Sequence, residues 1–497
     1  MRVFFKYIFW LLSFFTLIIF FIFATKLGSK TLGYFLGEYL SSKTSNIIKV
    51  ETFNLSNYPQ LIIDMKINNG AKVHFEGTAN YSSVDMHYHL QGKQYSWNDM
   101  VLNTPINIEG QMKGLVTNLK IKGKGKAFDG NITFNFTRIP NKYKNVHLHL
   151  SNVQSDTVLK FLKKKPLLRG RADIKSEFKF FSKYEREGNS TIYMKRGFMP
   201  SVAPYIPFIL HSNIEFKNFL YKFNGNIASD IGSLVIQNAY YHKILKKAEV
   251  DYNLNLNELS YFEELSKHQF HGKLNTKGMI HYEDKKFLLK GDTDKFDGKL
   301  LYKYKDKKLD LRLENVSLVK MLQQFHYPEL LSAKVFGTVE YDIEKKIAIV
   351  NTKLRKAHFC ETKLTNIISK AIGVNVLAEI YDNSSFVGGY QNERLNSILK
   401  IDNGINHFYL TDTILNKATN RINSKFAVLI HGDEVFGEIY GTLDHPSVSV
   451  DMRRLLTSQL KKRFSSFLGT SQTEKLKTDI DDLKGNLSKK LGDFFSK

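Results

Sequence analysis

The chain has 497 residues, enough for several ordinary domains or for one long repetitive domain. Its 38 Phe and 25 Tyr, against 9 Pro and 2 Trp, favour half-buried β-strands and exclude a disordered polar chain. The formal charge of +24 comes from Lys and Arg spread along the chain and interleaved with apolar residues, which argues against nucleic-acid binding. The single cysteine, Cys360, excludes an internal disulfide framework and a cysteine-rich zinc site.

The first predicted element is a membrane anchor. Residues 7–24, "YIFWLLSFFTLIIFFIFA", contain no charge, and at about 1.5 Å per residue they reach about 27 Å, close to a hydrocarbon core of about 30 Å. A cleavable signal peptide is the alternative, but its apolar run is usually about 7 to 15 residues and ends in a small-x-small site, which "IFATKLG" lacks. We expect an uncleaved, single-pass anchor within residues 1–25, with the bulk of the chain on the exported side.

A connecting helix is predicted next, over residues 26–48, and from residue 49 the apolar period changes to two. The alternation is clearest in "TNLKIKG" (117–123), "NVHLHL" (145–150), "VDYNLNL" (250–256) and "LDLRL" (309–313). In each stretch the apolar side chains share one face and the polar ones share the other. This pattern predicts antiparallel strands with one solvated face over residues 49–451.

Two motifs recur within this β region. "KAFDGNITFNF" (126–136) returns as "DKFDGKLLYKY" (294–304), and the pattern L-x-L-x-N-V before a short amphipathic helix occurs at 148–153 and 311–316. A third copy lies at 253–278 and a faint fourth at 87–114, whereas the pattern fades between 175 and 235. The spacing indicates a unit of about 55 residues, typical of stacked supersecondary repeats.

The alternating apolar side chains of these repeats are the candidate functional residues. They are Ile132, Phe134, Phe136, Leu148, Leu150, Leu254, Leu256, Leu300, Tyr302, Tyr304, Leu311 and Leu313. A filled core and an open, lipid-lined groove both require large apolar side chains at these positions. Both alternatives therefore remain open at the level of the sequence.

The sequence contains little that indicates catalysis or metal binding. The pairs His87 and His89, and His147 and His149, lie among Lys and Asn on the polar face, so we interpret them as solvated surface and not as zinc ligands. The Asp-Gly pairs at 129–130 and 297–298 predict hairpin turns in which Gly takes a positive φ. We expect no enzyme, no cofactor and no metal.

Residues 452–497 change to a helical period with many Lys and Arg on the polar side. Basic amphipathic helices of this kind suit a membrane surface or a partner protein. A cap on the open end of the β region is the alternative.

The anchor, the FDG strands, the L-x-L-x-N-V pattern and the closing "GEIYGTLDHPSVSVD" (437–451) together resemble the AsmA-like family of envelope proteins, relatives of TamB and YhdP. The resemblance covers residues 1 to about 470. Its most specific residues are Gly441, Thr442, Leu443, Pro446 and Val448. It implies an elongated, curved antiparallel sheet of repeating β-groove units, rooted in the inner membrane of a double-membrane bacterium and largely periplasmic.

The resemblance also implies a function in moving phospholipid toward the outer membrane. An unbroken apolar sheet face agrees with this, because such a face must close, pair with another sheet or hold an apolar ligand. The expected partners are phospholipids, the inner membrane and an envelope or outer-membrane partner at the C-terminal helices. Two alternatives remain: an assembly factor that pairs strands with outer-membrane β-barrel proteins, and a structural tether of the envelope.

Overall fold

A computed structural model of the chain describes residues 25–451, with gaps at 45, 56–57, 69, 98–99, 201–202, 264–268, 363–364, 367–368, 370–374, 431–432 and 444. The predicted anchor at 7–24 and the predicted C-terminal helices at 452–497 lie outside the described residues. Of the helices within the described part of the chain, none is long and apolar enough to cross a membrane.

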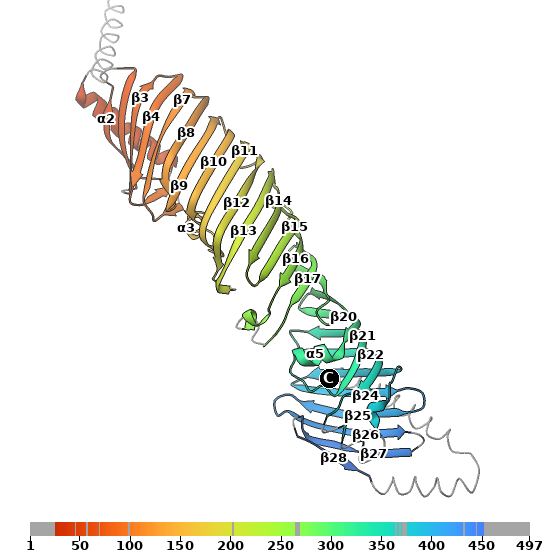
Figure 1. Ribbon diagram of the computed structural model, residues 1–497. Coiled ribbons are helices and arrows are strands. Elements are labelled where there is room, and N and C mark those ends of the chain that lie inside the picture. The colour runs from red at the N-terminus through yellow and green to blue at the C-terminus, as the bar shows by residue number, and fades with distance from the viewer. Residues whose placement is uncertain are drawn as a thin grey trace, which may run out of the picture. The chain divides into compact units, whose positions relative to one another are not determined.

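The protein is mostly β, as predicted, and 26 of its strands belong to one antiparallel sheet (Figure 1). It divides into two compact units, one formed by Met1–Ser266 with Tyr282–Asp284 and the other by Lys267–His281 with Lys285–Lys497.

The sheet strands of unit 1 are β1 (Ile48–Asn54), β2 (Gln60–Ile67), β3 (Ala71–Ala79), β4 (Ser83–Gly92), β7 (Ile106–Leu115), β8 (Asn118–Ala127), β9 (Gly130–Ile139), β10 (Lys142–Gln154), β11 (Arg169–Phe181), β12 (Arg186–Met199), β13 (Ala203–Lys217), β14 (Leu220–Ser229), β15 (Gly232–His242) and β16 (Lys247–Leu256). Each pairs with the next, and β4 pairs with β7 past a small hairpin of β5 (Tyr95–Trp97) and β6 (Met100–Leu102).

The strands of unit 2 are β17 (Leu274–Glu283), β18 (Lys286–Thr293), β19 (Lys299–Lys305), β20 (Lys308–Ser317), β21 (Leu331–Asp342), β22 (Ile347–Phe359), β23 (Ser384–Gln391), β24 (Arg394–Asp402), β25 (His407–Asn416), β26 (Arg421–Ile430), β27 (Asp433–Thr442) and β28 (Pro446–Val450). From β18 onward each strand again pairs with the next.

Helix α2 (Lys26–Thr44) occupies most of the segment for which the sequence predicts a connecting helix. It packs closely on β1, because two of its glycines face that strand. A Cβ on Gly33 would lie 3.0 Å from the Cβ of Phe53, and one on Gly37 would lie 3.0 Å from the carbonyl oxygen of Ile48. The Ser41 hydroxyl also accepts a hydrogen bond from the Ile48 backbone N–H at 2.9 Å.

The two repeated motifs form a single corner in unit 1. The β8–β9 turn places Phe128 and Asp129 at φ values of 56° and 58°, and Asn152, at φ 55°, forms a bulge in β10. The backbone N–H of Gln154 donates to the carbonyl oxygen of Phe128 at 2.9 Å, which joins the turn to the bulge. Helix α3 (Ser155–Phe161) begins at this corner, with Phe161 against Phe128 at 5.3 Å between ring centroids.

The same corner recurs in unit 2. Asn315, at φ 59°, forms the bulge in β20, and the backbone N–H of Ser317 donates to the carbonyl oxygen of Phe296 at 2.7 Å. Helix α5 (Leu318–Gln324) follows directly. The third copy instead continues from β16 into a short 3-10 turn, η1 (Ser260–Phe262), and the faint fourth contains the β5–β6 hairpin.

The prediction that the glycines of the FDG motif take a positive φ is wrong. Positive φ falls on the preceding residues, Asp129 and Asp297, and on neither Gly130 nor Gly298. These glycines instead allow the backbone of the bulge to approach the turn closely. A Cβ on Gly130 would lie 2.6 Å from the carbonyl oxygen of Asn152, and one on Gly298 would lie 2.2 Å from that of Asn315. Any side chain at either position would collide with the bulge.

The buried cores lie near these corners and connections. In unit 1, Leu102, Ile106, Ile108 and Ala127 form one cluster. A second is formed by Leu150, Val153, Ala172, Met194, Phe208 and Leu210. Unit 2 has a larger cluster of its own, built from strands β20 to β27 and from Val376 of the 3-10 turn η2 (Val376–Ala378).

Candidate functional site

One face of the unit 1 sheet is apolar from strand to strand, because register partners project to the same side. Ile132 of β9 pairs with Leu150 of β10, Leu150 with Ile174 of β11, and Ile174 with Ile192 of β12. Phe134 pairs with Leu148 beside this row. The predicted residues of β9 and β10 therefore lie on a common face, called here the apolar face of unit 1.

The same face continues to the last strand of unit 1. Ile192 of β12 pairs with the buried Ser212 of β13, and the neighbouring Met194 pairs with Leu210. Leu210 pairs with Ile227 of β14, Ile227 with Leu234 of β15, and Leu234 with Leu254 of β16. Leu256 lies two residues further along β16, on the same side. Predicted residues more than a hundred positions apart in sequence thus share one face.

The predicted residues of unit 2 also share a face. Leu300 of β19 pairs with Leu313 of β20, Tyr302 with Leu311, and Tyr304 with Leu309. The Tyr302 hydroxyl is hydrogen-bonded to the Thr276 hydroxyl at 2.5 Å. Its polar atom is therefore satisfied within the sheet.

The exposure of these residues differs along each strand. Leu150 and Leu313, next to the two corners, are 5% and 3% exposed. The other ten are only half-buried: Ile132, Phe134, Phe136, Leu148, Leu254, Leu256, Leu300, Tyr302, Tyr304 and Leu311. Four of these ten pack against the buried clusters: Ile132, Phe134, Leu148 and Leu300.

Aromatic rings form a row across the apolar face of unit 1, away from α3. Phe178 of β11 lies 5.2 Å from Phe216 of β13, Phe216 lies 5.3 Å from Tyr221 of β14, and Tyr221 lies 6.2 Å from Tyr241 of β15, all between ring centroids. Aromatic pairs at such separations stabilise each other beyond their area of contact. We call these four residues the aromatic row.

The rings of β9 continue this row toward the N-terminus. Phe136 lies 5.9 Å from Phe134 and 5.4 Å from Tyr143, and Tyr143 is the register partner of Phe181. Phe181 in turn lies 5.1 Å from Phe178. Phe134 and Phe136 were predicted from the sequence but the other rings were not, because the strand register that brings them together is not visible in the sequence.

Several rings cover a glycine of the neighbouring strand. A Cβ on Gly188 would lie 2.7 Å from a ring carbon of Phe178, and one on Gly123 would lie 2.6 Å from a ring carbon of Phe134. Tyr88 covers Gly110 in the same way, donates to the carbonyl oxygen of Lys122 at 3.1 Å, and has its pKa raised to about 12 by burial. The phenol therefore stays neutral.

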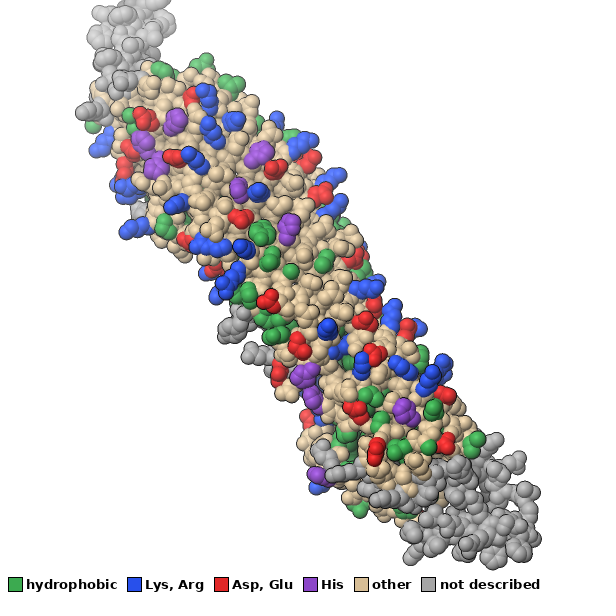
Figure 2. Space-filling view, in the orientation of Figure 1, with side chains coloured by type: hydrophobic (Ala, Val, Ile, Leu, Met, Phe, Trp, Pro, Cys, Tyr) green, Lys and Arg blue, Asp and Glu red, His purple; other side chains and the backbone are tan. Residues whose placement is uncertain are grey.

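The opposite face of the unit 1 sheet carries ion pairs, such as Lys113 with Asp85 at 2.7 Å and Lys124 with Glu109 at 3.3 Å. Figure 2 shows one side of the molecule, on which Lys and Arg are interspersed among Asp and Glu. Of the four histidines predicted to be solvated surface, His87 and His147 are exposed, whereas His89 and His149 are half-buried. The His89 ring is 2.7 Å from the side-chain oxygen of Asn107, and His147 is 3.9 Å from Glu177. Among the residues that the structure describes, no group of three His, Cys, Asp or Glu could hold a metal ion.

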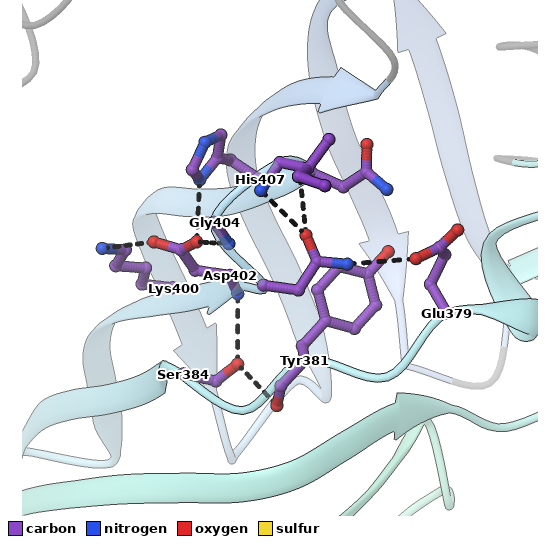
Figure 3. A network of polar contacts seen from close by, with 10 residues as sticks. Glu379, Tyr381, Ser384, Lys400, Asp402, Gly404 and His407 are labelled. Atoms are coloured by element: carbon purple, nitrogen blue, oxygen red, sulfur yellow. Dashed lines mark hydrogen bonds and ion pairs between the residues drawn. The ribbon is translucent and has the colours of Figure 1, made fainter.

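Asp402 in unit 2 is the most buried charged residue in the described part of the chain, and it was not predicted from the sequence (Figure 3). Asp402, 4% exposed, lies 2.7 Å from the Lys400 ammonium and 3.0 Å from Nδ1 of His407, and it accepts from the Gly404 backbone N–H at 2.7 Å. Burial raises the pKa of Asp402, but the hydrogen bonds from Lys400 and Gly404 and the charges of His407 and Lys400 outweigh it and hold the pKa below its ordinary value.

This polar network fixes the β24–β25 turn. The backbone N–H of Asp402 donates to the Ser384 hydroxyl at 3.1 Å, and the side-chain oxygen of Asn403 accepts from the Asn406 N–H at 2.7 Å. The Asn403 amide donates to Glu379 at 3.0 Å. An Asp followed by Asn and Gly between two alternating stretches was the available sequence signal, and it indicates a turn.

Comparison of the chain with family models, with curated proteins and with solved structures found no match. The chemistry of the candidate site therefore follows from its geometry. Half-exposed aliphatic and aromatic side chains, with no charged group among the predicted residues, suit contact with hydrocarbon.

Proposed function

We propose that the protein is anchored in the inner membrane, extends into the periplasm, and binds and conducts the acyl chains of phospholipids for outer-membrane lipid homeostasis. The observation that carries this proposal is the half-exposed apolar face of unit 1, continuous in register from β9 to β16. The AsmA-like resemblance supports the location and the curved, groove-like form of the sheet.

Hydrocarbon contact supplies the binding energy in this proposal. Burying one methylene group is worth about 0.8 kcal/mol, so a chain of about sixteen carbons gains on the order of ten kcal/mol. That affinity opposes release into water. Successive strands offer similar apolar side chains, so a lipid moves along the face at small net cost per step while its headgroup stays in solvent.

The experiment is native mass spectrometry of the full chain, purified with its co-purifying lipids, together with photo-crosslinking from position 134. Phe134→Asp places a charge on the apolar face, and we expect it to abolish lipid co-purification while circular dichroism stays unchanged. The matched control is Thr133→Asp, which adds the same charge to the exposed, polar side of β9. Retention of lipid by the Phe134→Asp protein would show that the face does not bind acyl chains.

The crosslinks also separate the alternative functions. Phospholipid adducts at position 134 support lipid conduction. Adducts with strands of outer-membrane proteins would indicate an assembly factor instead, and a protein that yields neither adduct would fit a structural tether.

A further inference from the structure

Helix α2 has two sides of different character. On one side Ser29, Gly33 and Gly37 are buried, the last two against β1. The remaining side carries four large apolar residues that are mostly exposed, Leu27 at 64%, Tyr34 at 64%, Phe35 at 63% and Tyr39 at 59%. Isolated exposed apolar residues are ordinary, but four on a single helix form a patch that suits an interaction surface.

The exposed residues are neighbours on the helix surface. Leu27 and Tyr34 are seven residues apart and Phe35 and Tyr39 are four apart, spacings that return to the same side of a helix. Tyr34 and Phe35 contact each other edge to face at 6.0 Å, and the Lys43 ammonium lies 5.9 Å from the centroid of the Tyr39 ring. The surface is aromatic with cationic neighbours.

Two further charged residues complete this surface. Lys30 and Glu38 are exposed on α2. Together with Lys43 they leave a small positive excess beside the aromatic residues. Tyr rings and Lys side chains are the residues that favour the interface between hydrocarbon and water, and a positive excess favours anionic headgroups.

The position of α2 in the chain indicates what its exposed apolar side contacts. The uncharged stretch 7–24 ends two residues before Lys26, where the helix begins. If that stretch spans the bilayer, which is part of the function proposed above, α2 starts at the membrane surface. We propose that the Leu27, Tyr34, Phe35 and Tyr39 side of α2 lies in the headgroup layer of the membrane that holds the anchor.

This placement has a consequence for the sheet. Because α2 packs on β1 through Gly33 and Gly37, a helix lying in the headgroup layer holds β1 at the bilayer surface.

The test is depth measurement by spin labels on the full chain. In a Cys360→Ser background, labels at Phe35→Cys and, as the matched control, at Lys120→Cys on the exposed polar side of β8 are placed in nanodiscs of phosphatidylcholine and phosphatidylglycerol. We expect the label at 35 to collide with oxygen several-fold more, relative to a water-soluble nickel chelate, than the label at 120. Equal ratios would overturn the proposal. Shielding of label 35 from both reagents would indicate a protein partner or a second copy, and would overturn it too.

A second pair of measurements separates this proposal from lipid conduction. The label at Leu27→Cys should lose its lipid contact when Tyr34, Phe35 and Tyr39 are all changed to Ser, even though the anchor sequence is intact. The Phe134→Asp protein should keep that contact. If the protein co-purifies with lipid while its α2 labels remain in water, the placement of α2 in the headgroup layer is wrong. That result leaves the proposal of lipid conduction intact.

Discussion

Asp402 is a buried charge whose partners are all local. Lys400 and His407 flank it on β24 and β25, and Gly404 donates from the turn between these strands. A buried carboxylate is tolerated only when its hydrogen-bonding capacity is met, and removal of one partner costs more than an ordinary surface pair. The group therefore stabilises one particular turn geometry.

Asp402→Asn should lower the free energy of unfolding of unit 2 at pH 7 by about 1.5–3 kcal/mol, because charge-assisted hydrogen bonds are lost. The folded-state pKa of Asp402 lies below its ordinary value of 3.8, so the carboxylate contributes stability above pH 3.8 and loses it as pH falls through the folded pKa. Thermal melts of both proteins at pH 7, 5 and 3 should converge in acid.

The matched control is Asp412→Asn in β25, whose carboxylate is exposed and 3.1 Å from the Lys425 ammonium. A solvated pair of this kind contributes less than about 1 kcal/mol. Equal destabilisation by the two substitutions at pH 7 would show that burial of Asp402 is not the cause.

Among the elements, the corner that joins the FDG turn to the bulge is the unit that repeats. In both copies a backbone N–H after the bulge donates to the carbonyl oxygen of the motif's Phe, and a short helix begins there. The corner turns the chain from the sheet into α3 or α5. Its residues recur because the geometry of the corner recurs.

Gly130→Ala should destabilise unit 1 by about 1–3 kcal/mol, the usual cost of overpacking, because the new Cβ would lie 2.6 Å from two carbonyl oxygens, those of Ser151 and Asn152. Asp129→Gly is the control. Its φ of 58° suits glycine, so we expect little loss of stability. Chemical denaturation measures both, and an unchanged midpoint for Gly130→Ala would rule out the close approach.

Many features of the strands and of the repeated corner could be predicted from the sequence. Period-two alternation predicted the strands, and the recurrence of L-x-L-x-N-V at 148–153 and 311–316 predicted the same local structure twice. The positive φ at Phe128 and Asp129 could not be predicted, because Asp-Gly normally places glycine in the left-handed region. The aromatic row was also missed, since Phe178, Phe216 and Tyr221 meet only through a register that includes bulges in β11 and β12.

At the scale of the whole molecule, unit 1 has two buried clusters and unit 2 has one among the described residues, and none of the three includes residues of both units. We expect two calorimetric transitions, since units with separate cores unfold independently unless they are coupled. Gly130→Ala should lower only one transition and Asp402→Asn only the other. A single transition that moves with either substitution would contradict independent unfolding.

Strands adjacent in the sheet are adjacent in the chain throughout β1–β16 and β18–β28, apart from the step over the β5–β6 hairpin. Partners separated by so few residues find each other quickly. Each new strand can therefore pair with one already in place as the chain folds from its N-terminal strands onward. Addition or deletion of one hairpin would alter such a sheet by about 9.6 Å, two strand spacings, and leave its cross-section unchanged.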